Sequence, residues 1–206
     1  METILVLSQN VSPVLAKHVC FGNYVVGVDA GALYCLRNGI KMHEAIGDFD
    51  SISYSAYLEL VASNVKMIKL PVEKDVTDTE FALQQFKGEV LILGGLLGKR
   101  FEHGLANALL LKRYPKAVIL DDYSKVFYIK APREIEVAKE EYRFLSVFPL
   151  GEIEIVGEGL QYPYPKKMEA YSSLGVSNEF KGDKAKLKLT SGEALVVLTK
   201  DDAVEF

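Results

Sequence analysis

Short apolar runs that are nearly continuous, without alternating polar residues, limit the fold of this chain more than any other feature. They are rich in β-branched residues and lie at 3–7, 24–28, 90–93 and 117–120, and a further strand-like segment at 65–70 contains two lysines. A strand buried on both faces needs apolar side chains at nearly every position, so such runs predict parallel strands. Helical patterns lie between them, and the alternation predicts an α/β domain with an open, mostly parallel sheet and flanking helices.

Polar residues follow these runs directly. Asp29 comes immediately after the run at 24–28, with Gly31 two positions later, before a helix expected over 32–38. Asp29 is as consistent with a helix cap as with a ligand-binding residue. Ligands of open parallel sheets bind beyond the carboxyl ends of the strands, so we expect the polar segments to converge on one crevice that holds a metal-bound polyphosphate. The segments concerned are Asp29, Asp48, Asp50, Asp75, Asp78 and the loop 94–100.

Residues 47–51 (GDFDS) concentrate negative charge. In an extended segment Asp48 and Asp50 point to one side and Phe49 to the other. Two carboxylates ~4 Å apart repel by roughly 4 kcal/mol at an effective dielectric constant near 20, and a bound divalent cation reverses that cost. Mg²⁺ is the cation that this pattern favours. A Gly-Asp turn with a helix cap at Asp50 or Ser51 explains the pentapeptide equally well.

Residues 74–78 (KDVTD) precede the next expected helix. Thr77 and Glu80 fit a capping box, which places Asp78 in the first turn, where the helix dipole favours an anion by ~0.3–1 kcal/mol. Capping leaves Lys74 and Asp75 unexplained, so a functional role for the segment is favoured.

A glycine-rich loop, residues 94–100 (GGLLGKR), joins the run at 90–93 to an expected helix over about 102–114. Its glycines allow backbone N–H groups to approach an anion, and the helix N-terminus, Lys99 and Arg100 add positive charge. The loop is one residue short of a Walker A spacing, and no Ser or Thr follows the lysine. A tight strand-to-helix turn with solvated basic residues is equally consistent.

Two of the expected helices carry an apolar stripe. The pattern over 54–63 places Tyr54, Leu58 and Val61 on one face, and Leu105, Ala106 and Leu109 are expected to form the buried face of the helix over 102–114.

After residue 124 the pattern changes to alternating polar and apolar residues, at 134–137, 152–155 and 186–189, with short turns between them. Such alternation indicates half-buried antiparallel strands, so we expect a second, C-terminal antiparallel β-sandwich domain. The expected domains are 1–123 and 124–206.

Composition excludes several classes of protein. A net charge of −4 argues against nucleic-acid binding, which requires a concentrated basic face. Two cysteines make no disulfide framework, and three histidines lack zinc-site spacing. No targeting segment or long apolar run is present, so we expect no membrane partner and a cytoplasmic location.

The motifs, taken in order, resemble those of thiamine pyrophosphokinases over nearly the whole chain. They are VDAGA at 28–32, GDFDS at 47–51, KDVTD at 74–78, RFEHGLAN at 100–107 and GVSNE at 175–179. The resemblance implies a homodimer that transfers a pyrophosphoryl group from ATP to thiamine and releases AMP, with Mg²⁺ as cofactor. It makes 1–123 the nucleotide, metal and catalytic domain, and 124–206 the domain for thiamine binding and dimerisation.

The resemblance also implies the residues of the site. Those for Mg²⁺ are Asp48, Asp50 and Asp78, and the catalytic set is Asp48, Asp50, Asp75, Asp78 and Arg100. Those for ATP are Asp29, Gly31, Lys74, Thr77, Gly95, Gly98, Lys99, Arg100, His103 and Asn107. Those for thiamine are Ser177 and Asn178.

Two departures and three other readings accompany the resemblance. The family usually has Asp-His where this chain has Glu102-His103, and some members use a tryptophan near thiamine, which this chain lacks. A Tyr or Phe is the alternative that would stack on the cationic ring. The Asp48-Phe-Asp50 pattern also occurs in glycosyltransferases that bind nucleotide sugars. A pyrophosphokinase for another alcohol, such as a pterin, and a nucleotide or thiamine sensor without turnover are the remaining readings.

Overall fold

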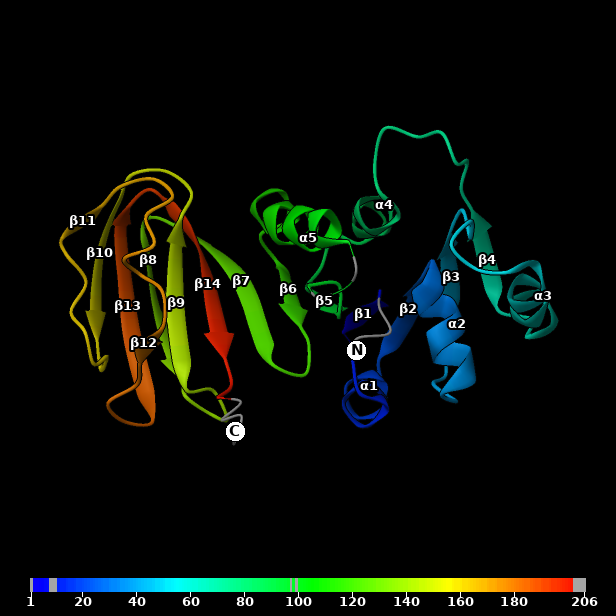
Figure 1. The fold of residues 1–206 in the computed structure, drawn as a ribbon, viewed down its shortest axis with the longest axis horizontal. Coiled ribbons are helices and arrows are strands. Elements are labelled where there is room, and N and C mark those ends of the chain that lie inside the picture. Colours follow the sequence, from blue (N-terminus) through cyan, green and yellow to red (C-terminus); the bar gives the residue numbers. More distant parts are fainter. Residues whose placement is uncertain (1, 8–10, 97, 99, 202–206) are drawn as a thin grey trace. The chain divides into compact units, whose positions relative to one another are not determined.

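The chain divides into two compact units, Met1–Asp122 and Tyr123–Phe206, in a computed structural model that describes residues 2–7, 11–96, 98 and 100–201 (Figure 1). The elements of the first unit are β1 (Thr3–Val6), α1 (Pro13–Cys20), β2 (Tyr24–Val28), α2 (Ala30–Arg37), β3 (Glu44–Gly47), α3 (Tyr54–Ala62), β4 (Lys66–Lys69), α4 (Asp78–Gln84), β5 (Val90–Leu93), α5 (Phe101–Arg113) and β6 (Ala117–Leu120). Those of the second unit are β7 (Ser124–Lys130), β8 (Arg133–Ala138), β9 (Phe144–Pro149), β10 (Ile153–Glu158), β11 (Lys167–Met168), β12 (Asn178–Glu179), β13 (Lys184–Ser191) and β14 (Glu193–Thr199).

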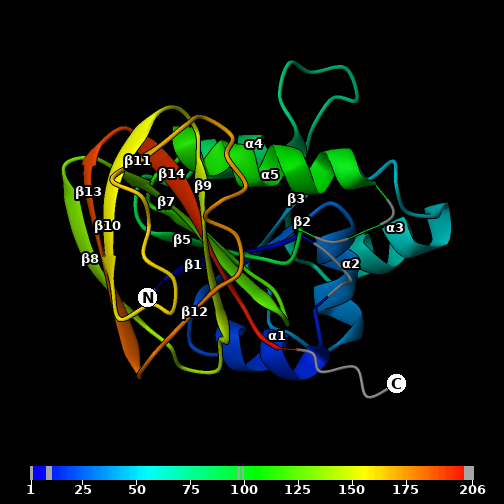
Figure 2. The same ribbon diagram turned by 60° about the vertical axis from the view of Figure 1, so that its left-hand side comes forward.

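The first unit is built on a parallel sheet in the order β6-β5-β1-β2-β3-β4. The helices α1 and α2, with α3 packed against α2, cover one face, while α4 and α5 lie on the other, as Figures 1 and 2 show. The direction in which the chain adds strands therefore reverses between β1 and β5. Such a reversal opens a crevice at the carboxyl ends of the strands, where ligands of this fold class bind.

The apolar runs of the sequence form the interior of this sheet. Ile4, Leu5 and Val6 of β1 are fully buried, as are Ile92 and Leu93 of β5. The edge strand β4 is the exception, because its two lysine ends are exposed. The predicted open, mostly parallel α/β domain is confirmed.

The buried face of α5 was predicted wrongly, and the apolar stripe of α3 faces solvent. Tyr54, Leu58 and Val61 of α3 are exposed, and so are Leu105 and Leu109 of α5. The buried side of α3 is formed by Ala56 and Leu60, and that of α5 by Gly104, Asn107 and Leu111. Small residues on the buried faces let these helices approach their neighbours closely. The larger apolar residues lie on the exposed side of each helix.

The second unit consists of two antiparallel sheets, β12-β9-β14-β7 and β11-β10-β13-β8. Alternate residues of β13 are buried, as its sequence predicts: Ala185, Leu187 and Leu189 face inward between exposed lysines. They pack with residues of β9 and β14, such as Val147 and Val196, in one apolar core. The expected antiparallel sandwich is therefore confirmed.

Both cysteines belong to the interior of the first unit. Cys20 of α1 and Cys35 of α2 lie in the same apolar cluster and are not joined by a disulfide. Burial raises the pKa of the Cys20 thiol to about 11. Burial, together with the nearby Cys20, also raises the pKa of the Cys35 thiol. Both side chains are therefore protonated and unreactive in the folded protein.

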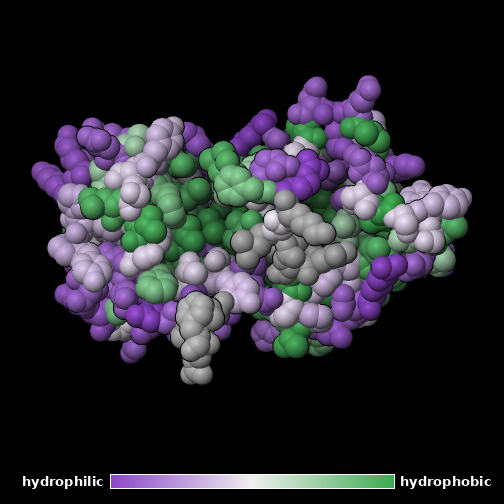
Figure 3. All heavy atoms as spheres, viewed as in Figure 1, coloured by the Kyte–Doolittle hydropathy of each residue, from purple (hydrophilic) through white to green (hydrophobic). Residues whose placement is uncertain are grey.

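The surface mixes residues of both kinds: on the face drawn in Figure 3, hydrophobic residues lie among hydrophilic ones. Within the described residues, no helix has both the length and the apolar character needed to cross a membrane.

Candidate active site

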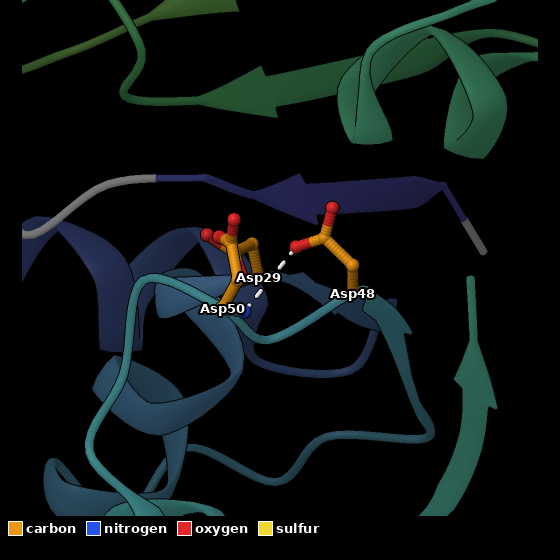
Figure 4. A group of neighbouring side chains, drawn as sticks. All are labelled: Asp29, Asp48 and Asp50. Atoms are coloured by element: carbon orange, nitrogen blue, oxygen red, sulfur yellow. Dashed lines mark hydrogen bonds between the residues drawn. The ribbon is translucent and has the colours of Figure 1, made fainter. Parts of the chain in front are cut away.

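Three aspartates from two strand ends meet in the first unit. Asp29 directly follows β2, and Asp48 and Asp50 follow β3, its neighbour in the sheet. One carboxylate oxygen of each lies within 4.8 Å of those of the others. Figure 4 shows the carboxyl groups of Asp29 and Asp50 side by side, with that of Asp48 facing them. The sequence separates these residues, but the parallel pairing of β2 with β3 brings them together.

The backbone of the cluster adopts conformations that residues with a side chain rarely use. Asp29 has φ 48° and ψ −120°, and Phe49 has φ 59°. A Cβ on Gly47 would lie 3.0 Å from the Asp29 Cα, so glycine permits the two segments to approach. Positive φ in non-glycine residues costs about 1–3 kcal/mol and is concentrated at functional sites.

The GDFDS segment is a turn and not the extended segment that the sequence suggested. Asp48 Oδ1 accepts a hydrogen bond from the Asp50 N–H at 3.3 Å, which closes the turn over Phe49. The Phe49 ring is only 5% exposed, so it anchors the turn in the core while both carboxylates stay outside it.

Lys74 connects this cluster with Asp78. Its Nζ donates to Asp48 Oδ2 at 2.6 Å and to the Pro71 carbonyl at 3.2 Å, and it forms an ion pair with Asp78 Oδ1 at 3.2 Å. The side chains of Lys74, Asp48 and Asp78 are 13%, 8% and 21% exposed. One ammonium group thus lies between two carboxylates, that of Asp48 after β3 and that of Asp78 at the start of α4, and balances part of their negative charge.

These contacts shift the pKa values in different directions. Burial opposes ionisation of Asp48, but hydrogen bonds from Lys74 and the Asp50 N–H outweigh it and hold the pKa below its usual value. The charge of Asp48 raises the pKa of Asp50. Burial raises the pKa of Asp78 despite Lys74. Burial alone would lower the pKa of Lys74, but its two carboxylate partners raise it. Divergent values of this kind are typical of functional sites.

Asp78 begins α4, as the sequence predicts. Thr77 is the N-cap, and its Oγ1 accepts from the Glu80 N–H at 3.1 Å. In a capping box the Glu80 carboxylate would accept from the Thr77 N–H. Here it accepts from Arg113 of α5 instead.

A pocket of about 250 Å³ opens next to the acidic cluster. Its walls come from the carboxyl ends of β1, β2 and β5, from the start of α4 and from the first two turns of α5. They are formed by Leu7, Val28, Asp29, Thr77, Asp78, Thr79, Gly95, Gly98, Arg100, His103, Gly104 and Asn107. The pocket therefore occupies the crevice where the strand order reverses.

The glycine loop has a conformation that requires glycine. Gly95 has φ 86°, and a Cβ there would lie 2.7 Å from Leu7 and 2.8 Å from the Asn107 amide. Asn107, buried on α5, donates to the Gly95 carbonyl at 2.9 Å and holds the loop against the helix. Backbone groups can thus approach a ligand closely at this edge of the pocket.

The donor set fits a divalent cation. Asp29 Oδ1 is buried without a hydrogen-bond partner, whereas Asp29 Oδ2 accepts from Ser51 Oγ at 2.5 Å. An unpartnered buried carboxylate oxygen beside two further carboxylates is costly unless a cation binds, and carboxylates are the ligands that Mg²⁺ takes in proteins. Asp29, expected as an ATP-binding residue, thus joins Asp48 and Asp50 in this cluster, while Asp78 is linked to it through Lys74.

Most of the residues expected around ATP line the pocket, and a few lie outside its lining. Asp29, Thr77, Gly95, Gly98, Arg100, His103 and Asn107 line the pocket. Gly31 is outside the lining, and its lack of a side chain is explained by packing, because a Cβ would lie 1.9 Å from the Val6 carbonyl. Asp75 is exposed and belongs neither to the lining nor to the acidic cluster. Lys99 lies outside the described residues.

Sequence reasoning missed Leu7, Val28, Thr79 and Gly104 as lining residues. Leu7 and Val28 stand where predicted strands end, so the rule that ligands bind beyond the carboxyl ends would have found them. Gly104 carries no such signal. A Cβ on Gly104 would lie 2.2 Å from the Leu96 carbonyl, a contact that only the fold reveals.

The two residues expected to bind thiamine lie in the second unit and differ in their contacts. Ser177 has φ 57°, and its N–H donates to the buried Ser146 Oγ at 2.9 Å. Asn178, 3% exposed, uses its amide on the backbone of Tyr162. The Asn178 side chain is therefore engaged within the unit.

Fold and site define a class: an α/β unit with a carboxylate cluster and a glycine-loop pocket at the strand-order reversal has the features with which enzymes bind a nucleotide and its metal ion. Two family models match this chain. One, described as "Thiamin pyrophosphokinase, catalytic domain", matches residues 18–120, and another, "Thiamin pyrophosphokinase, vitamin B1 binding domain", matches residues 133–194. The chain belongs to the thiamin pyrophosphokinase family.

Individual relatives agree with this family. The "Thiamine pyrophosphokinase" of Bacillus subtilis (strain 168) is 28% identical over 98% of this chain and 100% of the relative. A crystal structure of thiamine pyrophosphokinase from Bacillus subtilis has a TM-score of 0.84 at 27% identity, and covers 97% of this chain and 100% of its own. A crystal structure of a thiamin pyrophosphokinase family protein from Enterococcus faecalis has a TM-score of 0.82 at 27% identity, covering 98% and 100%.

Proposed function

We propose that this protein transfers the pyrophosphoryl group of ATP to the hydroxyl group of thiamine, with Mg²⁺, and releases thiamine diphosphate and AMP. Family membership makes it an enzyme of the thiamine pyrophosphokinase type. The observation that carries the finer proposal is the meeting of three carboxylates, a Lys74 bridge and a glycine-loop pocket at one edge of the sheet.

Each part of this edge has a role in the proposed reaction. Asp48, Asp50 and Asp78 are proposed to hold Mg²⁺, with Asp29 as the additional carboxylate of the cluster. When bound, the cation neutralises phosphate charge and orients the triphosphate for in-line displacement at its β-phosphorus. The Gly95 backbone and the first turn of α5 lie where they can donate to phosphate oxygens.

Basic and acidic side chains near the pocket complete the proposal. Arg100, which pairs with Glu102 at 2.7 Å, is exposed and free to turn from that surface partner to a phosphate. His103 and Asn107 line the same wall. Asp75 is proposed to accept the proton of the attacking hydroxyl, although it stands outside the pocket lining, and Asp75→Asn tests that role directly through kcat.

Product analysis tests the reaction. With ATP, Mg²⁺ and thiamine, AMP should form in equal amount to thiamine diphosphate, as measured by chromatography of the nucleotides. Stoichiometric ADP would overturn attack at the β-phosphorus. A panel of alcohols that includes a pterin separates the proposed substrate from related ones, and binding of a UDP-sugar in place of ATP would indicate a glycosyltransferase. Tight binding of ATP or thiamine without any product would indicate a sensor.

A homodimer is proposed, with metal and nucleotide bound by the first unit of one chain and thiamine contacted by the second unit of the other. The proposal is supported by the separation of the two sets of expected site residues between the units. The carboxylates and the glycine loop precede residue 123, whereas Ser177 lies in the sandwich. Asp50→Asn and Asn178→Ala chains, unfolded together and refolded as a mixture, should regain activity. A mixture that stays inactive despite proven subunit exchange would place the site within one chain. A cytoplasmic location remains part of the proposal.

A further inference from the structure

The ammonium of Lys74 occupies a position beside Asp48 for which a metal cation bound to Asp48 would compete. Its Nζ lies 2.6 Å from Asp48 Oδ2, 3.2 Å from Asp78 Oδ1 and 3.2 Å from the Pro71 carbonyl. The side chain is 13% exposed, so these contacts are largely shielded from water and salt. The ammonium therefore has two hydrogen-bond acceptors within the protein, Asp48 Oδ2 and the Pro71 carbonyl, and a close ion pair with Asp78.

Asp48 has no disengaged oxygen in this arrangement. Oδ2 accepts from Lys74, and Oδ1 accepts from the Asp50 N–H at 3.3 Å. A divalent cation that binds Asp48 has to displace the ammonium or to sit beside it. The second arrangement is unfavourable, because the two positive charges repel at contact distance.

We propose that Lys74 is an internal counter-cation that keeps the carboxylate site closed to free Mg²⁺, so that the metal enters together with the nucleotide. This inference rests on the proposed metal site. The phosphates of the incoming nucleotide offer Lys74 an alternative anion, and its move to them frees Asp48 and Asp78 for the cation. One side chain thereby links occupation of the metal site to occupation of the pocket.

The test is a calorimetric titration of the full-length protein with Mg²⁺ and with Mn²⁺, in the absence of nucleotide. Lys74→Met removes the charge and keeps most of the chain length. It should bind the free metal at least about tenfold more tightly than the wild type, because one nearby positive charge has been removed. Lys74→Arg keeps the charge and should remain weak. Unchanged or weaker binding by Lys74→Met would overturn the proposal.

Two further variants distinguish a wrong role for Lys74 from a wrong metal site. Lys69 ends β4 with its Nζ 5.2 Å above the Tyr57 ring, so Lys69→Met removes a lysine near the site that is engaged elsewhere. Its metal affinity should stay close to that of the wild type. Asp48→Asn, combined with Lys74→Met, should abolish the gained affinity. If the double variant still binds the metal tightly, the proposed metal site itself is wrong.

A second measurement does not depend on any substitution. The melting temperature of the wild type should barely respond to millimolar Mg²⁺ alone and should rise when a non-hydrolysable ATP analogue is added with Mg²⁺. The metal-free Lys74→Met protein should melt below the wild type and recover when metal is supplied. A wild type that Mg²⁺ alone stabilises as much as the metal and nucleotide together would contradict the proposed order.

Discussion

The side-chain amide of Asn178 pairs with both backbone groups of Tyr162. Nδ2 donates to the Tyr162 carbonyl at 2.7 Å, and Oδ1 accepts from the Tyr162 N–H at 3.0 Å. Together with the bond from the Gln161 N–H to the Glu179 carbonyl, this pair ties the segment after β10 to β12. Asn178 therefore links two segments of the sandwich.

Asn178→Ala should lower the free energy of unfolding by roughly 1–3 kcal/mol, because it leaves the Tyr162 backbone groups without their partner. It should raise the KM for thiamine so far that the variant is nearly inactive at thiamine concentrations that saturate the wild type, and it should leave the KM for ATP unchanged. Urea unfolding and steady-state kinetics measure the two effects. Gln161→Ala, which keeps the backbone bond of this residue, is the control. Full stability in Asn178→Ala would show that the hydrogen bonds between Asn178 and Tyr162 are dispensable.

Asp48→Asn and Asp50→Asn should each reduce kcat/KM by more than about 100-fold, since even outer-shell residues of metal sites cost 10–100-fold. Their effects on the metal-free protein should differ in sign. Asp50 is disfavoured by the charge of Asp48, so Asp50→Asn should raise the melting temperature. Asp48→Asn loses the Lys74 ion pair and should lower it. Wild-type activity of both variants at saturating Mg²⁺ would exclude this cluster as the metal site.

Gly95→Ala should destabilise the fold by about 1–3 kcal/mol, because its φ of 86° is unfavourable for alanine and the new Cβ would meet Leu7 and Asn107. The affinity for ATP should fall with it. Gly88→Ala is the matched control, as a Cβ there has open space, and its stability should change by less than about 1 kcal/mol. Equal effects of the two substitutions would contradict a special role for the glycine loop.

The Tyr128 hydroxyl donates to Glu193 Oε2 at 2.6 Å across β7 and β14. Burial, aided by this carboxylate, raises the pKa of Tyr128 to about 12 from an ordinary value of 10. Because the folded pKa is the higher one, the stabilisation is complete below pH 10 and is lost as the pH rises from 10 to 12. Urea unfolding should place Tyr128→Phe below the wild type by about 1 kcal/mol at pH 8, with the gap narrowing above pH 10. A constant gap over that range would contradict the shifted pKa.

Much of the fold can be predicted from the sequence because buried strands need apolar residues at fixed positions. The continuous runs at β1 and β5 and the alternation at β13 show this directly. Helix faces cannot be predicted in the same way. The apolar stripes of α3 and α5 face solvent, while small residues such as Ala56 and Gly104 make the close contacts.

The location of the candidate site, and the convergence of Asp29 with Asp48 and Asp50 there, could be predicted from the strand ends, but the contacts within the site could not. The close approach of Asp29 to the other two carboxylates depends on its positive φ and on the pairing of β2 with β3, neither of which has a local sequence signal. The Lys74 bridge likewise depends on how the loop after β4 folds back.

The two buried thiols allow the opening of the first unit to be measured by chemical labelling. Both cysteines of the chain lie in one apolar cluster of that unit, and the second unit has none. A thiol reagent added to the native protein should react only as fast as this cluster opens, so the labelling rate measures the opening of the first unit alone. Adding ATP with Mg²⁺, or thiamine by itself, would then reveal which ligand slows that opening.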